Sequence, residues 1–155
     1  MNLSEIRKQI DALDAQILKA LNNRAKLAQK VGQCKAHANS PYYVPCREEA
    51  LLKGLSKKNK GPLSEASVRA IYKEIISACT AQQKPLKIAY LGPEATYTHQ
   101  AALKNFGHSL PMRAMATIPD VFAAVEKKEV DYGVVPIENS TEGAVFHSLD
   151  MLVES

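Results

Sequence analysis

The first part of the chain repeats apolar residues every three or four positions, and this spacing predicts one long amphipathic helix. The pattern runs from Leu3 to about Ala38, and the segment contains no proline and a single glycine, Gly32. A helix of about 35 residues measures roughly 50 Å at 1.5 Å per residue. Because that is longer than a small domain is wide, we expect its apolar stripe to need a partner chain.

Two shorter helices are predicted to follow the long one. Two prolines within five residues interrupt the helical pattern after residue 38. The expected elements are a loop at 39–45, a helix at about 47–55, a basic turn at 57–62 and a third helix that Ser64 caps. Residues 1–84 are therefore predicted to form an all-α domain of three helices.

From residue 85 onward, short apolar runs alternate with helical segments. Strands are predicted at 87–91, 112–116 and 131–137, with helices at about 99–106, 119–128 and 143–153. Alternating strands and helices predict a parallel sheet with right-handed crossovers. A sheet of about three strands is small. We therefore expect residues 85–155 to be an incomplete α/β lobe, and the chain to be the amino-terminal part of a longer protein.

Composition narrows the class of protein. Hydrophobic residues make up 46% of the 155 residues and charged residues 23%, which is typical of a globular protein. No apolar run approaches the ~20 residues of a membrane span, and charges throughout residues 1–17 exclude a signal peptide. Cys34, Cys46 and Cys79 lack CxxC spacing, and the four histidines lack metal-ligand spacing. These features predict a cytoplasmic protein without disulfides or a bound metal.

Two cations interrupt the apolar stripe of the long helix. Arg24 lies seven residues from an apolar position on either side, and Lys35 lies eleven residues after Arg24. Both therefore lie on the stripe. A buried cation must be paired or must bind an anion. The alternatives are that both side chains reach solvent, or that they pair with Glu48 or Glu74. Because two cations share the stripe, a small anionic ligand is the favoured interpretation.

Further polar residues lie at helix ends. Gln83 follows the apolar side of the third helix, and Arg47 and Glu48 open the second. A glutamate at a helix start suits the helix dipole, whereas an arginine does not. Arg7 lies 28 residues before Lys35, roughly 40 Å on a straight helix. The two can meet at one ligand only if two long helices run antiparallel across a two-fold axis. Taken singly, each of these residues also fits a surface role.

These separated polar positions resemble the all-helical class of chorismate mutase, over about residues 3–84. The resemblance rests on the segments 6–11, 23–28, 31–35 and 47–49, together with Gln83. It implies an interlocked homodimer with two composite active sites and no cofactor. It also implies that Arg24, Lys35 and Gln83 are catalytic, with Lys35 and Gln83 donating hydrogen bonds to the ether oxygen of chorismate.

The same resemblance implies the remaining contacts with chorismate. Arg7 of the partner subunit, Arg24 and Arg47 would bind its carboxylates, and Glu48 would accept a hydrogen bond from the ring hydroxyl. Cys79 stands where some members of the family have serine, and is carried over as a substrate-binding residue.

The second half carries a different resemblance. Residues 91–98 are similar to the glycine–proline turn that opens prephenate dehydratase domains, and residues 135–143 resemble the second signature of that family. The implied half of a dehydratase site consists of Thr96, Thr98, Glu138, Asn139, Ser140 and Thr141. Such residues after a strand also suit a structural role as helix caps. The catalytic Thr-Arg-Phe motif of that family does not occur in this sequence, so we expect dehydratase activity to be absent.

Together the halves resemble the bifunctional chorismate mutase/prephenate dehydratase family of phenylalanine biosynthesis. The expected ligands are chorismate and prephenate, with neither nucleic acid nor a membrane as partner. One alternative keeps the helical fold as a regulatory or isochorismate pyruvate lyase module. Another is a basic helical dimer, of net charge +4, that binds nucleic acid through residues 57–60. Cations inside an apolar stripe, rather than on an exposed face, favour the enzyme.

Overall fold

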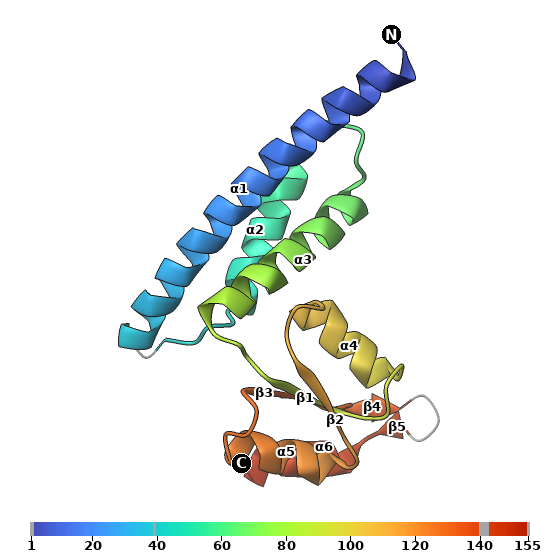
Figure 1. Ribbon diagram of the computed structural model, residues 1–155. Coiled ribbons are helices and arrows are strands. Elements are labelled where there is room, and N and C mark those ends of the chain that lie inside the picture. Colours follow the sequence, from blue (N-terminus) through green and yellow to red (C-terminus); the bar gives the residue numbers. More distant parts are fainter. Residues whose placement is uncertain (1, 39, 140–142, 155) are drawn as a thin grey trace.

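Helices form the first half of the chain in the computed structural model, which describes residues 2–38, 40–139 and 143–154. They are α1 (Leu3–Ala38), α2 (Pro45–Lys58) and α3 (Glu65–Gln83), and we call residues 2–84 the helical region (Figure 1). The predicted span of α1 is confirmed. Ser64 caps α3 as predicted, since its side chain accepts a hydrogen bond from the Ser67 amide at 3.0 Å.

The bounds of α2 differ from the prediction at both ends. Pro45 lies in its first turn, where the missing N–H costs no hydrogen bond, so the helix begins two residues early. The helix also continues through Lys58, and the predicted turn at 57–62 is therefore wrong for its first two residues. Asn59 ends the helix, and its amide donates to the carbonyls of Leu55 and Ser56.

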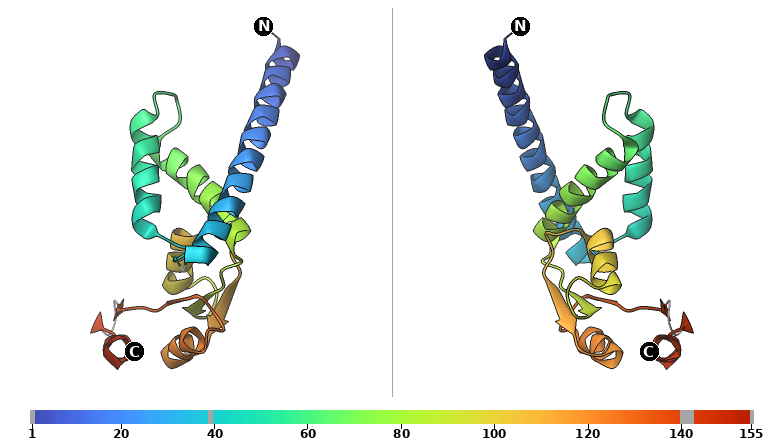
Figure 2. Two further views of the ribbon diagram at one scale, coloured as in Figure 1. Left: turned by 90° about the vertical axis from the view of Figure 1, so that its left-hand side faces the viewer. Right: turned by 90° about the vertical axis from the view of Figure 1, so that its right-hand side faces the viewer.

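The apolar stripe of α1 is left uncovered along most of its length. α1 packs on α3 but diverges from α2, so that α1 and α2 resemble the two arms of a V (Figure 2). The buried residues of α1 are Ala28 and Gly32, whereas Leu3 and Leu13 are 62% and 56% exposed. The prediction that this chain does not cover its own stripe is confirmed.

The second half, residues 85–154, which we call the α/β region, contains a three-stranded parallel sheet in the order β2-β1-β3. Its elements are β1 (Ile88–Leu91), α4 (Tyr97–Phe106), β2 (Met112–Met115), α5 (Ile118–Glu126) and β3 (Tyr132–Val134). In the central strand, Ile88 packs with Phe106 of α4 and Ala89 packs with Val121 of α5. Because successive strand residues face opposite sides, α4 and α5 cover opposite faces of the sheet (Figure 1). The predicted α/β class is confirmed.

The last part of the α/β region departs from the prediction. The third strand is shorter than 131–137, and β4 (Glu138–Asn139) pairs antiparallel with β5 (Gly143–Ala144), a ladder that the sequence pattern did not predict. Because Gly143 belongs to this ladder, α6 (Phe146–Glu154) begins three residues later than predicted. Likewise α4 begins at Tyr97 rather than 99, because Thr96 caps it.

The helical and α/β regions pack directly against each other. The ring of Tyr43, from the loop before α2, lies 4.7 Å from the ring of Phe106 between centroids. The Ser77 hydroxyl donates to the Phe106 carbonyl at 2.6 Å. Gly107 fits here because a Cβ at this position would lie 2.5 Å from the Cβ of Ser77. The Glu74 carboxylate also accepts hydrogen bonds from the backbone and ring of His108.

Candidate active site

A cavity of about 540 Å³ lies between α1, α2 and α3. The loop before α2 closes one side of it through Tyr42, Tyr43 and Val44. Six of the predicted site residues line it: Arg24, Lys35, Arg47, Glu48, Cys79 and Gln83. Residues separated by up to 59 positions in the sequence are thus gathered around one space by the packing of three helices.

The two cations of the α1 stripe are partly buried and lack acidic partners. Arg24 donates to the Ile75 carbonyl at 3.4 Å, and Lys35 Nζ donates to the Tyr42 carbonyl at 2.9 Å. Among the described residues neither forms an ion pair, because Glu48 pairs with Lys73 and Glu74 with His108. The alternative that Glu48 or Glu74 neutralises these cations is therefore wrong.

Burial changes the protonation of two groups that line the cavity. It lowers the pKa of Lys35, because the charged ammonium is partly removed from water. Burial and the nearby charge of Glu48 raise the pKa of Tyr43 to about 12. Near neutral pH the Tyr43 phenol therefore keeps its proton.

The carboxamide of Gln83 is presented to the cavity by a close helix contact. Gly32 of α1 lies against the backbone of Gln83, where a Cβ would approach the Gln83 Cα and carbonyl oxygen to 2.8 Å. Glycine at position 32 therefore lets α1 and α3 approach closely beside the cavity. Gln83 Oε1 is buried and has no hydrogen-bond partner among the described residues. Buried polar groups are usually satisfied, and this oxygen can only accept a hydrogen bond, so a donor role of Gln83 falls to its Nε2 group.

The remaining residues of the cavity differ in exposure. Cys79 is 6% exposed and contributes to the apolar wall. Arg47 is exposed at the start of α2. The Glu48 side chain is 11% exposed and is paired with Lys73 of α3. The cavity therefore combines cations, a paired carboxylate and an unpaired amide.

Arg7 does not reach this cavity within one chain. It lies in an exposed part of α1, and α1 is unbroken from Leu3 to Ala38. Figure 1 shows the amino terminus at the far end of α1 from the loop that leads to α2. The role of Arg7 of the partner subunit stays a prediction.

The structure places the predicted dehydratase residues on several elements. Thr96 caps α4: its hydroxyl accepts from the His99 amide at 3.3 Å and donates to the Pro93 carbonyl at 3.0 Å. Thr98 is partly buried within α4, whereas Glu138 is exposed in β4. Asn139 belongs to β4, while Ser140 and Thr141 lie outside the described residues. The common site of these residues stays a prediction.

Sequence reasoning missed two features of the cavity surroundings. Lys73, which pairs with Glu48, was not singled out. A signal was present, because Lys73, Ile76, Thr80 and Gln83 follow one another at steps of three, four and three and so share a helix face. The loop residues Tyr42 and Tyr43 also line the cavity, and no periodicity predicts the position of a loop.

Comparison with known proteins agrees with this arrangement. Residues 6–84 match the family described as chorismate mutase type II, and residues 88–155 match prephenate dehydratase. The chain belongs to the chorismate mutase type II family. A structure of chorismate mutase (form II) from Thermus thermophilus has a TM-score of 0.52 and 32% identity, covering 53% of this chain and 93% of that chain.

Longer relatives match both halves of the chain. The bifunctional chorismate mutase/prephenate dehydratase of Aquifex aeolicus is 50% identical over 157 aligned residues, covering 99% of this chain and 43% of the relative. The protein of the same name from Neisseria gonorrhoeae is 47% identical over 146 residues, covering 94% and 40%. The chain thus spans about two fifths of the length of these relatives.

These matches confirm the resemblance and do not favour the lyase, regulatory or nucleic-acid-binding alternatives. Among the described residues, no helix is both long and apolar enough to span a membrane.

Proposed function

We propose that the chain converts chorismate to prephenate in the cavity between α1, α2 and α3. The observation that carries this proposal is the pair Arg24 and Lys35, which are partly buried and have no described acidic partner. Two such cations call for an anionic ligand, and chorismate is a small dianion. The cavity volume of about 540 Å³ lies within the usual range for small-molecule sites.

The chemistry of this reaction fits the residues that line the cavity. The rearrangement is a single pericyclic step in which an ether C–O bond breaks as a C–C bond forms, so it requires neither a nucleophile nor a cofactor. The enzyme must hold the compact chair conformer and stabilise the negative charge that develops on the ether oxygen. We propose that Lys35 and Gln83 donate hydrogen bonds to the ether oxygen. Arg24 and Arg47 would bind the carboxylates, and Glu48 would accept a hydrogen bond from the ring hydroxyl.

The proposed active form is a homodimer in which α1 runs antiparallel to α1 of a second copy. The uncovered stripe supports this arrangement, since Ile6, Ile10 and Leu13 are 40%, 50% and 56% exposed. Apolar surface of this kind is stabilised by burial against a partner. Arg7 cannot reach the cavity of its own chain. In the antiparallel dimer, Arg7 of the partner subunit would reach it instead.

We place the reaction in phenylalanine biosynthesis in the cytoplasm, with residues 1–84 and 85–155 as two domains. The matches at residues 6–84 and 88–155 support this division, and the three free cysteines suit a reducing compartment. Because the sequence has no Thr-Arg-Phe motif, we expect this chain to produce prephenate without dehydrating it.

The test is the loss of chorismate absorbance with the purified chain, followed by acid conversion of prephenate to phenylpyruvate. Lys35→Ala removes a preorganised donor and should lower kcat/KM by about 100-fold or more. Lys19→Ala, at an exposed position of the same helix, should stay within about twofold of the wild type. A folded dimer that consumes no chorismate would refute the proposal, and phenylpyruvate before acid treatment would refute the absence of dehydratase activity.

A further inference from the structure

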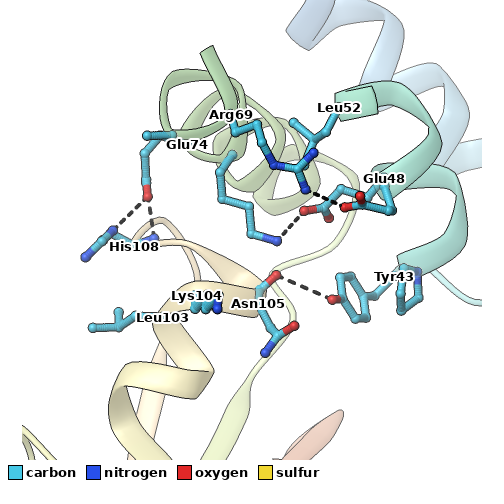
Figure 3. Close-up of a pocket in the computed structure, with 13 residues that line it drawn as sticks. Tyr43, Glu48, Leu52, Arg69, Glu74, Leu103, Lys104, Asn105 and His108 are labelled. Carbon is cyan, nitrogen blue, oxygen red and sulfur yellow. Dashed lines mark hydrogen bonds and ion pairs between the residues drawn. The ribbon is translucent and has the colours of Figure 1, made fainter. Parts of the chain in front are cut away.

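Glu48 lies in the wall between two cavities. It lines the cavity of about 540 Å³ described above and a second one of about 560 Å³ between α2, α3 and α4, which Figure 3 shows. Lys73 lines the second cavity and is absent from the residues that line the first. The Lys73 ammonium therefore approaches the Glu48 carboxylate from the side that faces away from the proposed substrate.

The ion pair between Lys73 and Glu48 is more sheltered than its neighbour. The two side chains are 20% and 11% exposed, and Lys73 Nζ contacts Glu48 Oε1. One turn earlier on α3, Arg69 pairs with Glu49 at 2.7 Å, with side chains 34% and 43% exposed. Because a sheltered carboxylate without a counterion is costly, the contact with Lys73 stabilises the Glu48 side chain in this position.

The two oxygens of Glu48 have different surroundings. Oε1 is bound by Lys73, whereas Oε2 receives no hydrogen bond from any of the described residues. A carboxylate oxygen accepts hydrogen bonds and donates none while it is ionised. One oxygen thus orients the group, and the other remains able to accept a hydroxyl proton.

We propose that Lys73 is a positioning residue for the mutase reaction: it fixes Glu48 through Oε1 and leaves Oε2 for the ring hydroxyl of chorismate. This inference rests on the proposed function. Lys73 also offsets the charge of Glu48, so that a dianionic substrate does not meet an unpaired carboxylate. Lys73 itself does not touch the substrate.

Several charged groups surround Glu48. Arg24 and Lys35 of α1 and Arg47 of α2 share its first cavity, with the Tyr43 phenol beside it. Glu74, Lys104 and His108 lie around the second cavity. Among the described residues only Lys73 forms an ion pair with Glu48, so we expect the loss of Lys73 to affect the orientation of this carboxylate most.

The experiment compares Lys73→Met with Arg69→Met, a matched loss of a cation on the same helix and the same second cavity. Lys73→Met should lower kcat/KM about tenfold, because the two oxygens of Glu48 lose their fixed orientation. Lys73→Arg keeps the cation and should restore most of the rate, and Arg69→Met should stay within about twofold of the wild type.

A double-mutant cycle separates positioning from a general structural effect. In a Glu48→Gln background, Lys73→Met should change kcat/KM by less than about twofold, because residues that act through one another are not additive. If Lys73→Met does not fold, Lys73→Gln takes its place. An active wild type whose Lys73→Met variant keeps its rate would overturn the proposal, as would full additivity in the cycle.

The chemical shift of the Glu48 carboxyl carbon at a fixed pH, measured by NMR on the free protein, distinguishes this inference from the proposed function. Lys73→Met should change this chemical shift, because Oε1 loses its partner, and Arg69→Met should not. An unchanged chemical shift in Lys73→Met overturns the pairing whether or not the chain is active. A wild type that consumes no chorismate refutes the proposed function, and with it the role of Lys73 in positioning Glu48 for substrate.

Discussion

The helical and α/β regions use their apolar residues in different ways. Both hydrophobic clusters of the described chain centre on the α/β region, one around Ile88 and the other around Val121. The helical region instead leaves the apolar residues of α1 exposed. In a strand–helix–strand unit, the crossover helix packs on the sheet and covers its apolar face. The pattern of a long helix shows which face must be covered but not what covers it. We therefore expect a second chain to affect the helical region more than the α/β region.

The largest effect is expected from a charge on the uncovered stripe. Ile10→Lys should keep the chain monomeric at micromolar concentration, because an ammonium would be buried in the dimer interface. Chorismate turnover should fall about 100-fold or more, since the proposed contribution of Arg7 of the partner subunit to the cavity would be lost. Sedimentation and the chorismate assay measure both effects.

Ala12→Lys is the matched control for this change, because it adds the same side chain about 200° around the helix. We expect it to leave assembly and turnover close to wild type. A monomeric Ile10→Lys chain with full activity would contradict the composite site, and an unchanged dimer would contradict the proposed interface.

Gly107 tests the contact between the two regions. It has a φ of +71°, and a Cβ would lie 2.5 Å from the Cβ of Ser77. Gly107→Ala should lower the free energy of unfolding by about 2 kcal/mol, through backbone strain and the clash. Gly143→Ala shares the positive φ, but its Cβ would meet no described atom within 4 Å, so this variant measures the backbone strain alone. If urea unfolding shows equal losses of stability in Gly107→Ala and Gly143→Ala, the contact with Ser77 does not contribute.

The helices and the two cations of the α1 stripe are predictable from the sequence because each depends on a local pattern. The span of α1 was predicted because its apolar period continues without a proline over 36 residues. The two-residue strands β4 and β5 were missed, because so short a segment shows no alternation. Arg24 and Lys35 were found because a charge in an apolar stripe breaks a local pattern.

The contacts between elements that are distant in the sequence cannot be predicted from such local patterns. The pairing of Lys73 with Glu48 depends on how α2 packs against α3, and the sequence period does not define that packing. Tyr43 joins the ring cluster of the α/β region through a loop. Its contacts join residues more than 60 positions apart and have no local signature.

Titration of Lys35 in the helical region should appear in activity on the alkaline side. Burial lowers its pKa below 10.5, so as the pH is raised the folded site begins to lose this cation before pH 10.5 is reached. We expect kcat/KM to be flat from about pH 6 to 8, and then to fall by about tenfold per pH unit once Lys35 deprotonates. Lys35→Arg, slower but charged throughout, should move this limb upward. A limb that begins only above pH 10.5 would contradict the assignment.

Titration of Asp131 in the α/β region should instead appear in stability on the acid side. Burial alone would raise its pKa, but the Lys84 ammonium and the Lys87 amide hold it below 3.8. A lowered carboxyl pKa stabilises the fold above the unfolded value, and that stability is lost as pH falls through the folded value. Asp131→Asn should therefore remove about 1 kcal/mol at pH 6 and less at pH 2. Equal losses at both pH values in urea unfolding would contradict the ion pair.

The smallest effect, from Gly54 in α2, tests whether the space around the helical region is open. No atom of the described residues lies within 4 Å of a Cβ built at this position. Gly54→Ala should therefore raise the free energy of unfolding by about 0.5–1 kcal/mol, because alanine restricts the unfolded chain and favours helix. Ala50→Gly, one turn earlier on an exposed position, should cost about as much. Gly54→Ala could instead lower stability at concentrations where the chain is a dimer and not after dilution to monomer. That result would place the second chain against α2, and the interface would then extend beyond the α1 stripe.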